Sequence, residues 1–154
     1  SLKRIKAWPP AMYHLGQALM ASALLQALPD RNENERLDLQ WKVDKGVFGS
    51  VYAECRAASE AFLLRGTVLY PQPAIESLHV PMGPGLFQVR RLSPQLQQPL
   101  SSGIVESAGD VVLDALSYLE KSEQRYCGVN FSVVLDWDTR QKSRFEATDS
   151  GGRP

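Results

Sequence analysis

The sequence predicts a single mixed α+β domain, and two observations carry this expectation. A long uncharged segment with large and small apolar residues is followed by several segments in which apolar and polar residues alternate, as they do in strands with one buried face. The 154 residues, of which 44% are hydrophobic and 22% charged, suit one globular domain with a sizeable core. We therefore expect residues 1–154 to form one domain in which antiparallel strands pack against a buried helix.

The first expected element is a helix from about Ala11 to Leu28. Pro9 and Pro10 precede it, and proline is tolerated in a first helical turn because its missing N–H needs no partner there. Large apolar side chains are interspersed with alanine and glycine, and the segment contains no charged residue. A helix without a charged face is normally buried on several sides, so we expect this one to lie in the core.

A meander of three antiparallel strands is expected next. Residues 37–43 alternate between apolar and polar side chains, which is typical of a half-buried strand. A turn at Asp44–Gly46 leads into a second strand at Val47–Glu54. A third strand is expected at Ala61–Leu69, after a polar bend at Arg56–Glu60.

The second half of the chain adds further strands. Prolines interrupt residues 71–84, where one short helix is expected at Ala74–Leu78. Strands are expected at Leu86–Leu92 and Gly103–Val105, and a last long one at Tyr126–Leu135.

A second helix is expected between the last two of these strands. Ser107 and Asp110 are spaced as the two members of a capping box, which predicts the start of this helix. We expect four residues to face the core and four others to face solvent: Val112, Ala115, Leu116 and Leu119 on the first face, and Asp110, Asp114, Ser117 and Lys121 on the second.

Charge and hydropathy argue against two classes of partner. Lys+Arg and Asp+Glu both number 17, so no net charge draws the whole molecule to nucleic acid or to an acidic membrane. His14, Gln17 and Gln26 interrupt the first helix, which argues against a membrane span. We therefore expect neither nucleic acid nor membrane as a partner.

The two cysteines, Cys55 and Cys127, indicate the compartment. They lie far apart in the sequence, without the short spacing of a zinc site. The basic start runs into Pro9-Pro10 instead of an apolar signal region. Since secreted domains of this size often carry several disulfides, a reducing compartment is expected. The cytoplasm is the first interpretation and an organelle matrix is the alternative.

No catalytic, cofactor or metal site is expected. The segment Gly46–Tyr52 resembles the glycine-rich loop of protein kinases, but Asp44 stands where the first glycine belongs, and the other kinase motifs are missing. His14 and His79 lack neighbouring ligands, and the loop at Asp136–Asp138 has an incomplete calcium pattern. We therefore interpret the chain as a binding protein and not as an enzyme.

Several strings resemble the core domain of the heat shock protein 33 family. Pro9-Pro10-Ala11 opens the helix that contains Leu-Gly-Gln-Ala-Leu at 15–19. Further matches are Leu-Asp-Leu-Gln at 37–40, Tyr-Ala-Glu-Cys at 52–55 and Leu-Arg-Gly at 64–66. The most specific match is Gly-Ile-Val-Glu at 103–106, followed at the end of the next helix by Tyr118-Leu119-Glu120-Lys121-Ser122-Glu123-Gln124.

This resemblance implies an α+β fold of three layers, β/α/β, with antiparallel sheets around a buried helix. It also implies a stress-response chaperone of the holdase type, which binds unfolding proteins, can dimerise, and is redox-regulated through a separate C-terminal zinc domain with four cysteines. This sequence ends before such a domain, and neither Cys55 nor Cys127 matches a zinc position. We therefore expect no cofactor in this chain, and the redox control is not carried over to it.

Three interpretations remain open. The first is a holdase core whose partners are unfolded proteins, together with a homodimer or a larger assembly. The second is a diverged family member that serves as a structural or assembly subunit of a larger complex, which the altered sequence at Gln40–Asp44 favours. The third is an unrelated small enzyme, for which no residue constellation is found. The aromatic residues Trp41, Phe48 and Tyr52 are the candidates for client contact, although each also fits core or strand packing.

Overall fold

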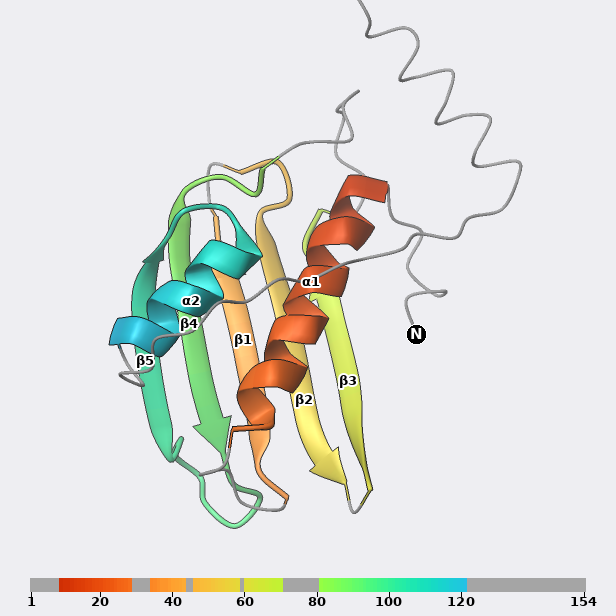
Figure 1. Ribbon diagram of the computed structural model, residues 1–154, viewed down its shortest axis with the longest axis vertical. Helices are drawn as coiled ribbons and strands as arrows, with labels where there is room; N and C mark the ends of the chain where they lie inside the picture. Colours follow the sequence, from red (N-terminus) through yellow and green to blue (C-terminus); the bar gives the residue numbers. More distant parts are fainter. Residues whose placement is uncertain (1–8, 29–33, 44–45, 59, 71–80, 122–154) are drawn as a thin grey trace, which may run out of the picture.

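The computed structural model describes residues 9–28, 34–43, 46–58, 60–70 and 81–121. Their elements follow the order α1 (Pro9–Gln26), β1 (Arg36–Lys42), β2 (Ser50–Ala58), β3 (Ala61–Val68), β4 (Gly85–Leu92), β5 (Ser101–Ser107) and α2 (Val111–Lys121), as Figure 1 shows. The expected α+β class with an antiparallel sheet is confirmed. None of the helices in this part of the chain combines the length and the apolar character needed to cross a bilayer.

The five strands form one antiparallel sheet in the order β3-β2-β1-β4-β5. The first strand of the described residues, β1, is therefore the central strand, while β3 and β5 lie at the two ends of this order. Both helices lie on the same face of the sheet (Figure 1). The second sheet of the expected three layers is not found among the described residues, and the strand expected at Tyr126–Leu135 lies outside them.

Alternation along β1 divides the sheet into two faces. Leu37, Leu39 and Trp41 are fully buried, and the hydrogen bond from Trp41 to Asp114 of α2 places this set of alternate residues on the face that carries the helices. Arg36 and Asp38 point the other way, to the face that we call the outer face. Apolar burial on one face only is what the period of two in the sequence predicted.

Helix α1 packs against β1, β2, β3 and α2. Ten of its 18 residues are buried, although Tyr13 and Leu24 remain exposed. Gly66 on β3 permits the close approach, because a Cβ there would come within 2.7 Å of the Leu15 side chain and 2.8 Å of the Tyr52 carbonyl oxygen. The uncharged helix is thus buried along the face toward the sheet and α2, as expected for a core helix.

Two strand boundaries differ from the expectation at the β1–β2 and β2–β3 connections. Residues 46–49 form a turn, with the Gly46 N–H donating to the Val43 carbonyl at 2.8 Å and Gly49 at a φ of 72°, so β2 begins at Ser50 and not at Val47. The polar bend expected at Arg56–Glu60 is shorter than predicted, since β2 continues to Ala58. Pairing with β3 overrides the polar character of this stretch.

The expected capping box is wrong, because Ser107 is the last residue of β5. Asp110 alone caps α2: its Oδ1 accepts from the Leu113 N–H at 2.9 Å, and its carbonyl oxygen accepts from the Asp114 N–H at 3.0 Å. Gly109 before it has a φ of 81° and lies against Gly83, where an added Cβ would come within 2.9 Å of the Gly83 carbonyl oxygen.

Asp114 was expected on the solvent face of α2, and this expectation is also wrong. Its carboxylate is 1% exposed and accepts from the Trp41 indole N–H at 2.9 Å and from the Ser107 hydroxyl at 2.5 Å. The Ala108 backbone N–H donates to its other oxygen at 2.8 Å. Since a buried carboxylate is costly unless hydrogen-bonded, these three donors explain why α2 turns this face inward.

A second set of hydrogen bonds, centred on Glu35, lies at the opposite end of the sheet, where β1 begins. Arg91 of β4 donates to both carboxylate oxygens of Glu35, with a shortest distance of 2.9 Å. The Gln26 side chain at the end of α1 donates to the Glu35 carbonyl oxygen at 3.0 Å. The entry into β1 is therefore joined to both α1 and β4. The helix expected at Ala74–Leu78 lies outside the described residues.

The Asp114 contacts make a testable prediction about stability. We expect Asp114→Ala to lower the free energy of unfolding by about 3 kcal/mol, because Trp41 and Ser107 lose a charged acceptor in a buried site. Glu120→Ala removes an exposed carboxylate from the same helix and is expected to change it by less than about 0.5 kcal/mol. Denaturant unfolding followed by tryptophan fluorescence measures both, and equal effects of the two substitutions would contradict the assignment.

Candidate functional site

The three aromatic candidates do not form one surface. Trp41 is fully buried and stacks on Phe87, with ring centroids 4.3 Å apart. Phe48 is also fully buried and contacts the His14 ring edge-on at 5.2 Å. Tyr52 lies half-buried on the outer face, where its hydroxyl donates to Glu54 at 3.0 Å. Of these three candidates, only Tyr52 exposes part of its surface to a partner in this conformation. The alternation of side chains along β1 turns Trp41 toward the helices.

An exposed apolar segment that sequence reasoning did not single out lies on β3. Phe62, Leu63 and Leu64 are 42%, 60% and 44% exposed. We call these three residues the β3 apolar segment. Three consecutive apolar residues project to both faces of the strand, because successive side chains alternate. The signal in the sequence was this unbroken run, whose exposure depends on the position of β3 in the sheet.

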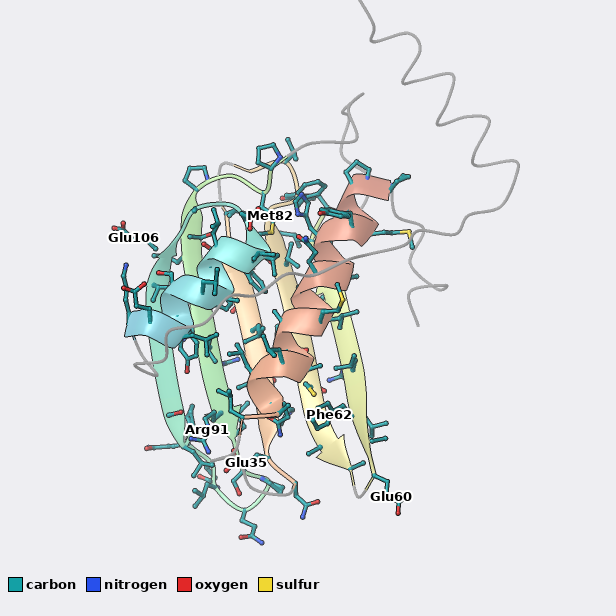
Figure 2. All side chains as sticks on the ribbon, in the orientation of Figure 1. Glu35, Glu60, Phe62, Met82, Arg91 and Glu106 are labelled. Carbon is teal, nitrogen blue, oxygen red and sulfur yellow. The ribbon has the colours of Figure 1, made fainter. Side chains whose placement is uncertain are left out.

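The geometry of the sheet explains why this segment is uncovered. Helix α1 crosses the sheet obliquely, and the turn between β2 and β3, marked by Glu60, projects beyond the helix (Figure 2). β3 is the last strand in the sheet order of the described residues, with β2 as its neighbour. An edge strand with exposed apolar side chains is suited to contact with another chain, and no further strand of the described residues pairs with the outer backbone groups of β3.

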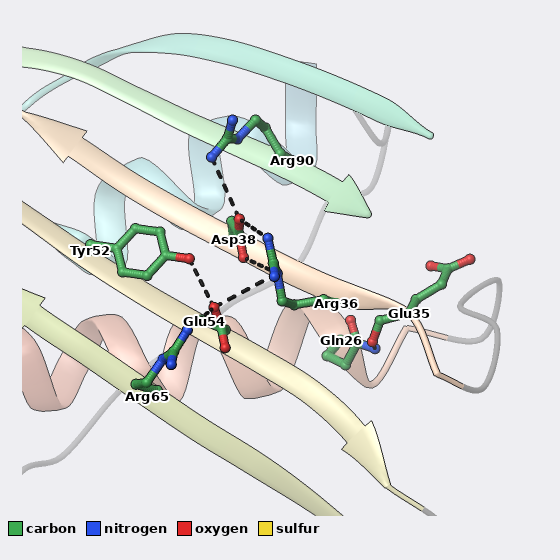
Figure 3. Close-up of polar contacts among 8 residues, drawn as sticks. All are labelled: Gln26, Glu35, Arg36, Asp38, Tyr52, Glu54, Arg65 and Arg90. Carbon is green, nitrogen blue, oxygen red and sulfur yellow. Dashed lines mark hydrogen bonds and ion pairs between the residues drawn. The ribbon is translucent and has the colours of Figure 1, made fainter. Parts of the chain in front are cut away.

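The outer face carries a row of charges across four strands (Figure 3). Asp38 and Glu54 are directly opposite each other in the β1–β2 register, while Arg90 is opposite Asp38 and Arg65 is opposite Glu54. Arg36 lies between the two carboxylates, with its Nε 3.0 Å from Asp38 and 3.7 Å from Glu54. The arginines therefore compensate a pair of like charges that would otherwise repel.

This row is unusual for an open sheet face because its carboxylates are buried. The side chain of Asp38 is 2% exposed and that of Glu54 is 10% exposed, whereas the side chain of Arg65 is 72% exposed. The pKa of Tyr52 is raised well above its ordinary value by partial burial, by the charge of Asp38 and by its hydrogen bond to Glu54. Tyr52 therefore remains protonated and acts as a hydrogen-bond donor.

The buried cysteine, Cys55, has an unreactive thiol. Cys55 lies on β2 with no exposed area, and it is a free thiol. Burial raises the pKa of this thiol from 9.0 to about 11, which suppresses the reactive thiolate at neutral pH. In the described part of the chain, no three His, Cys, Asp or Glu side chains come together as a metal site requires. Cys127, His79 and Asp136–Asp138 lie outside that part.

These features define a class: an antiparallel α+β domain with apolar side chains displayed along an edge strand. The comparisons with known proteins agree with the α+β fold and identify the family. The family described as Hsp33 protein matches residues 1–151, so the chain belongs to the Hsp33 family, a family of chaperones. The resemblance found in the sequence is thereby confirmed.

A solved structure supports the same assignment. The chain is similar to the 33 kDa chaperonin (heat shock protein 33 homologue) of Thermotoga maritima, with a TM-score of 0.57 and 26% identity. The similarity covers 75% of this chain and 40% of the Thermotoga protein. A further short match, 77% identical over 22 residues, is to the urease accessory protein UreE of Albidiferax ferrireducens. It covers 14% of this chain and 13% of that protein, and it carries no argument about the fold.

The burial of Cys55 leads to a prediction about its reactivity. In a Cys127→Ser variant at pH 8, we expect a thiol reagent to label Cys55 at least about a hundredfold more slowly than in the denatured chain, because the folded thiol is buried and protonated. The thiol is easier to deprotonate in the unfolded chain than in the folded one, so its contribution to the free energy of unfolding is complete below pH 9.0 and is lost as the pH rises toward about 11. Cys55→Ala should abolish this loss. Rapid labelling of the folded protein would contradict the placement of Cys55.

Proposed function

We propose that this chain holds unfolded or partly unfolded proteins by contact with exposed apolar side chains, without catalysing a reaction on them. Membership of a chaperone family supports this proposal. The observation that carries it is the β3 apolar segment, in which three consecutive side chains are between 42% and 60% exposed on an edge strand. Displayed apolar area of this kind is what a holdase needs to capture an unfolding chain.

The energetics favour a weak but adaptable contact. Fully burying an exposed leucine or phenylalanine contributes about 1.5–3 kcal/mol, so three partly exposed side chains contribute a few kcal/mol in total before ordering costs. The backbone groups on the outer edge of β3, which pair with no other strand of the described residues, can add hydrogen bonds that do not depend on the client's sequence. Such a surface suits many unfolded clients better than one folded partner.

The proposal requires no resident cofactor and no catalytic residue in this chain. Its partners are unfolded proteins, with a second copy of the chain or a larger assembly as further partners, in a reducing compartment such as the cytoplasm. The buried state of Cys55 withholds this thiol from redox control, so any such control is proposed to depend on other residues of the family's proteins.

Suppression of client aggregation tests the proposal. We expect the chain to suppress the aggregation of a denaturant-unfolded client at near-stoichiometric amounts. Leu63→Lys should require about fivefold more protein for the same effect, because a charge replaces exposed apolar area in the β3 apolar segment. The readout is light scattering after dilution of the client.

Leu113→Lys provides the matched control, because Leu113 is 55% exposed on α2, away from β3. It should suppress aggregation as well as the unaltered chain does. Equal losses for the two variants, with both folded by circular dichroism, would exclude β3 as the contact. If the folded chain itself does not suppress aggregation, the holdase proposal fails, and a structural subunit of a larger complex becomes the better interpretation.

A further inference from the structure

The outer face of the sheet carries more positive than negative charge, although the whole chain is neutral. The row described above places three arginines, Arg36, Arg65 and Arg90, against two carboxylates, which leaves a surplus of one positive charge. Arg56 adds a second, because it is exposed on β2 and directly opposite Arg36 in the register. We call these four arginines the arginine strip.

The surplus positive charge is accessible to a partner because the carboxylates of the row are buried and its arginines are partly exposed. The two carboxylates lie under the guanidinium groups, with Asp38 2% and Glu54 10% exposed. Arg65 is 72% exposed and Arg90 is 39% exposed at their side chains. A partner approaching this part of the sheet therefore meets guanidinium groups, while the compensating charges lie beneath them.

The carboxylates also hold the guanidinium groups in place. Within the described chain, Arg65 uses one nitrogen on Glu54 at 3.1 Å, and Arg90 uses one nitrogen on Asp38 at 3.5 Å. A guanidinium has five N–H donors, so each retains further donors for a second acceptor. Side chains already fixed by one ion pair lose less conformational entropy when they bind another acceptor.

One contact in the strip is unfavourable without a ligand. Arg36 and Arg56 face each other across neighbouring strands, and like charges at such positions repel. Arg36 is engaged by Asp38, whereas no carboxylate among the described residues lies within ion-pair distance of Arg56. An anionic group bound between Arg56 and Arg65 would relieve this repulsion.

Apolar side chains flank the strip on the same face. Leu63 is opposite Arg56 on β3, and Ile104 lies on β5, with 60% and 58% exposure. Tyr52 is the one aromatic residue on the outer faces of the five strands, which is a poor stacking platform for nucleic-acid bases. Guanidinium groups between exposed leucine and isoleucine instead match a polypeptide with carboxylates beside apolar residues.

We propose that the arginine strip binds acidic, apolar segments of extended polypeptides. This inference rests on the proposed function and deepens it, because Leu63 belongs to the β3 apolar segment and also flanks the arginine strip, so that a client held at β3 extends onto the outer face. The class of client so selected is an unfolded segment in which Glu or Asp alternates with large apolar residues, whose side chains would pair with Arg56 and Arg65.

Binding of a fluorescent peptide tests the proposal. The probe is an extended twelve-residue peptide of alternating Glu and Leu, and its control has Gln in place of Glu. Fluorescence anisotropy at about 50 mM salt should show Arg56→Gln binding the acidic peptide roughly tenfold more weakly than the unaltered chain, with a smaller salt dependence. Lys121→Gln removes the same charge from α2, on the helix side, and should bind within about twofold of the unaltered chain.

The stability of Arg56→Gln separates binding from folding. Since this substitution removes the repulsion with Arg36, its midpoint of unfolding should equal or exceed that of the unaltered chain. Equal affinity for the Glu and Gln peptides, or an unchanged affinity in Arg56→Gln, would overturn the proposal. Tighter binding of single-stranded DNA than of the acidic peptide would also overturn it, in favour of a nucleic-acid surface.

The test distinguishes this inference from the proposed function. Aggregation suppression that persists without any binding of the acidic peptide would overturn the arginine strip alone. Peptide binding that persists while the folded chain fails to suppress aggregation would overturn the holdase function and the client role of the strip.

Discussion

The buried carboxylate of Asp114 is the constraint on which the arrangement of this domain depends. Its oxygens accept from Trp41 on the central strand and from Ser107 and Ala108 at the end of the last described strand. A carboxylate removed from water needs such donors, because its desolvation costs several kcal/mol. The helix that carries it is therefore held against the sheet beside β5, and its orientation is fixed by polar contacts as well as by apolar packing.

This placement has a consequence at the other edge of the sheet. With α2 against β5, α1 packs on β1, β2 and β3 and crosses them obliquely (Figure 1). The end of β3 beside the turn at Glu60 projects beyond the helix, so Phe62 and Leu64 remain partly exposed even though they point to the helix side. The same scaffold that buries Trp41 thus leaves apolar area at one edge, where a binding protein can use it.

Much of this architecture could be predicted because it follows from local periodicity. The alternation from Leu37 to Val43 identified the central strand, and the uncharged segment after Pro10 identified the core helix. The buried position of Asp114 could not be predicted, because helical spacing places this residue among polar residues and its partner Trp41 lies 73 positions away. The exposure of Leu63 depends on strand order, since the same apolar run would be buried in a central strand.

The positive charge of the outer face could not be predicted from the sequence either. From the sequence, Arg65 and Arg90 were expected within strands and Arg56 in a polar bend, and the neutral composition did not indicate a positive surface. Only the register places Arg36 beside Arg56 and brings Asp38 and Glu54 under their guanidinium neighbours. Surface charge in this domain is therefore a property of strand pairing and not of composition.

Site-specific crosslinking tests the central claim, that unfolded chains contact the uncovered edge at β3. A photoreactive amino acid is placed at Leu63, or at Leu113 as the exposed control on α2, and the protein is illuminated with an unfolding client. The account predicts abundant client crosslinks from position 63 and few from position 113, with competition by a second unlabelled client. Equal crosslinking at the two positions, or crosslinks confined to position 113, would contradict it.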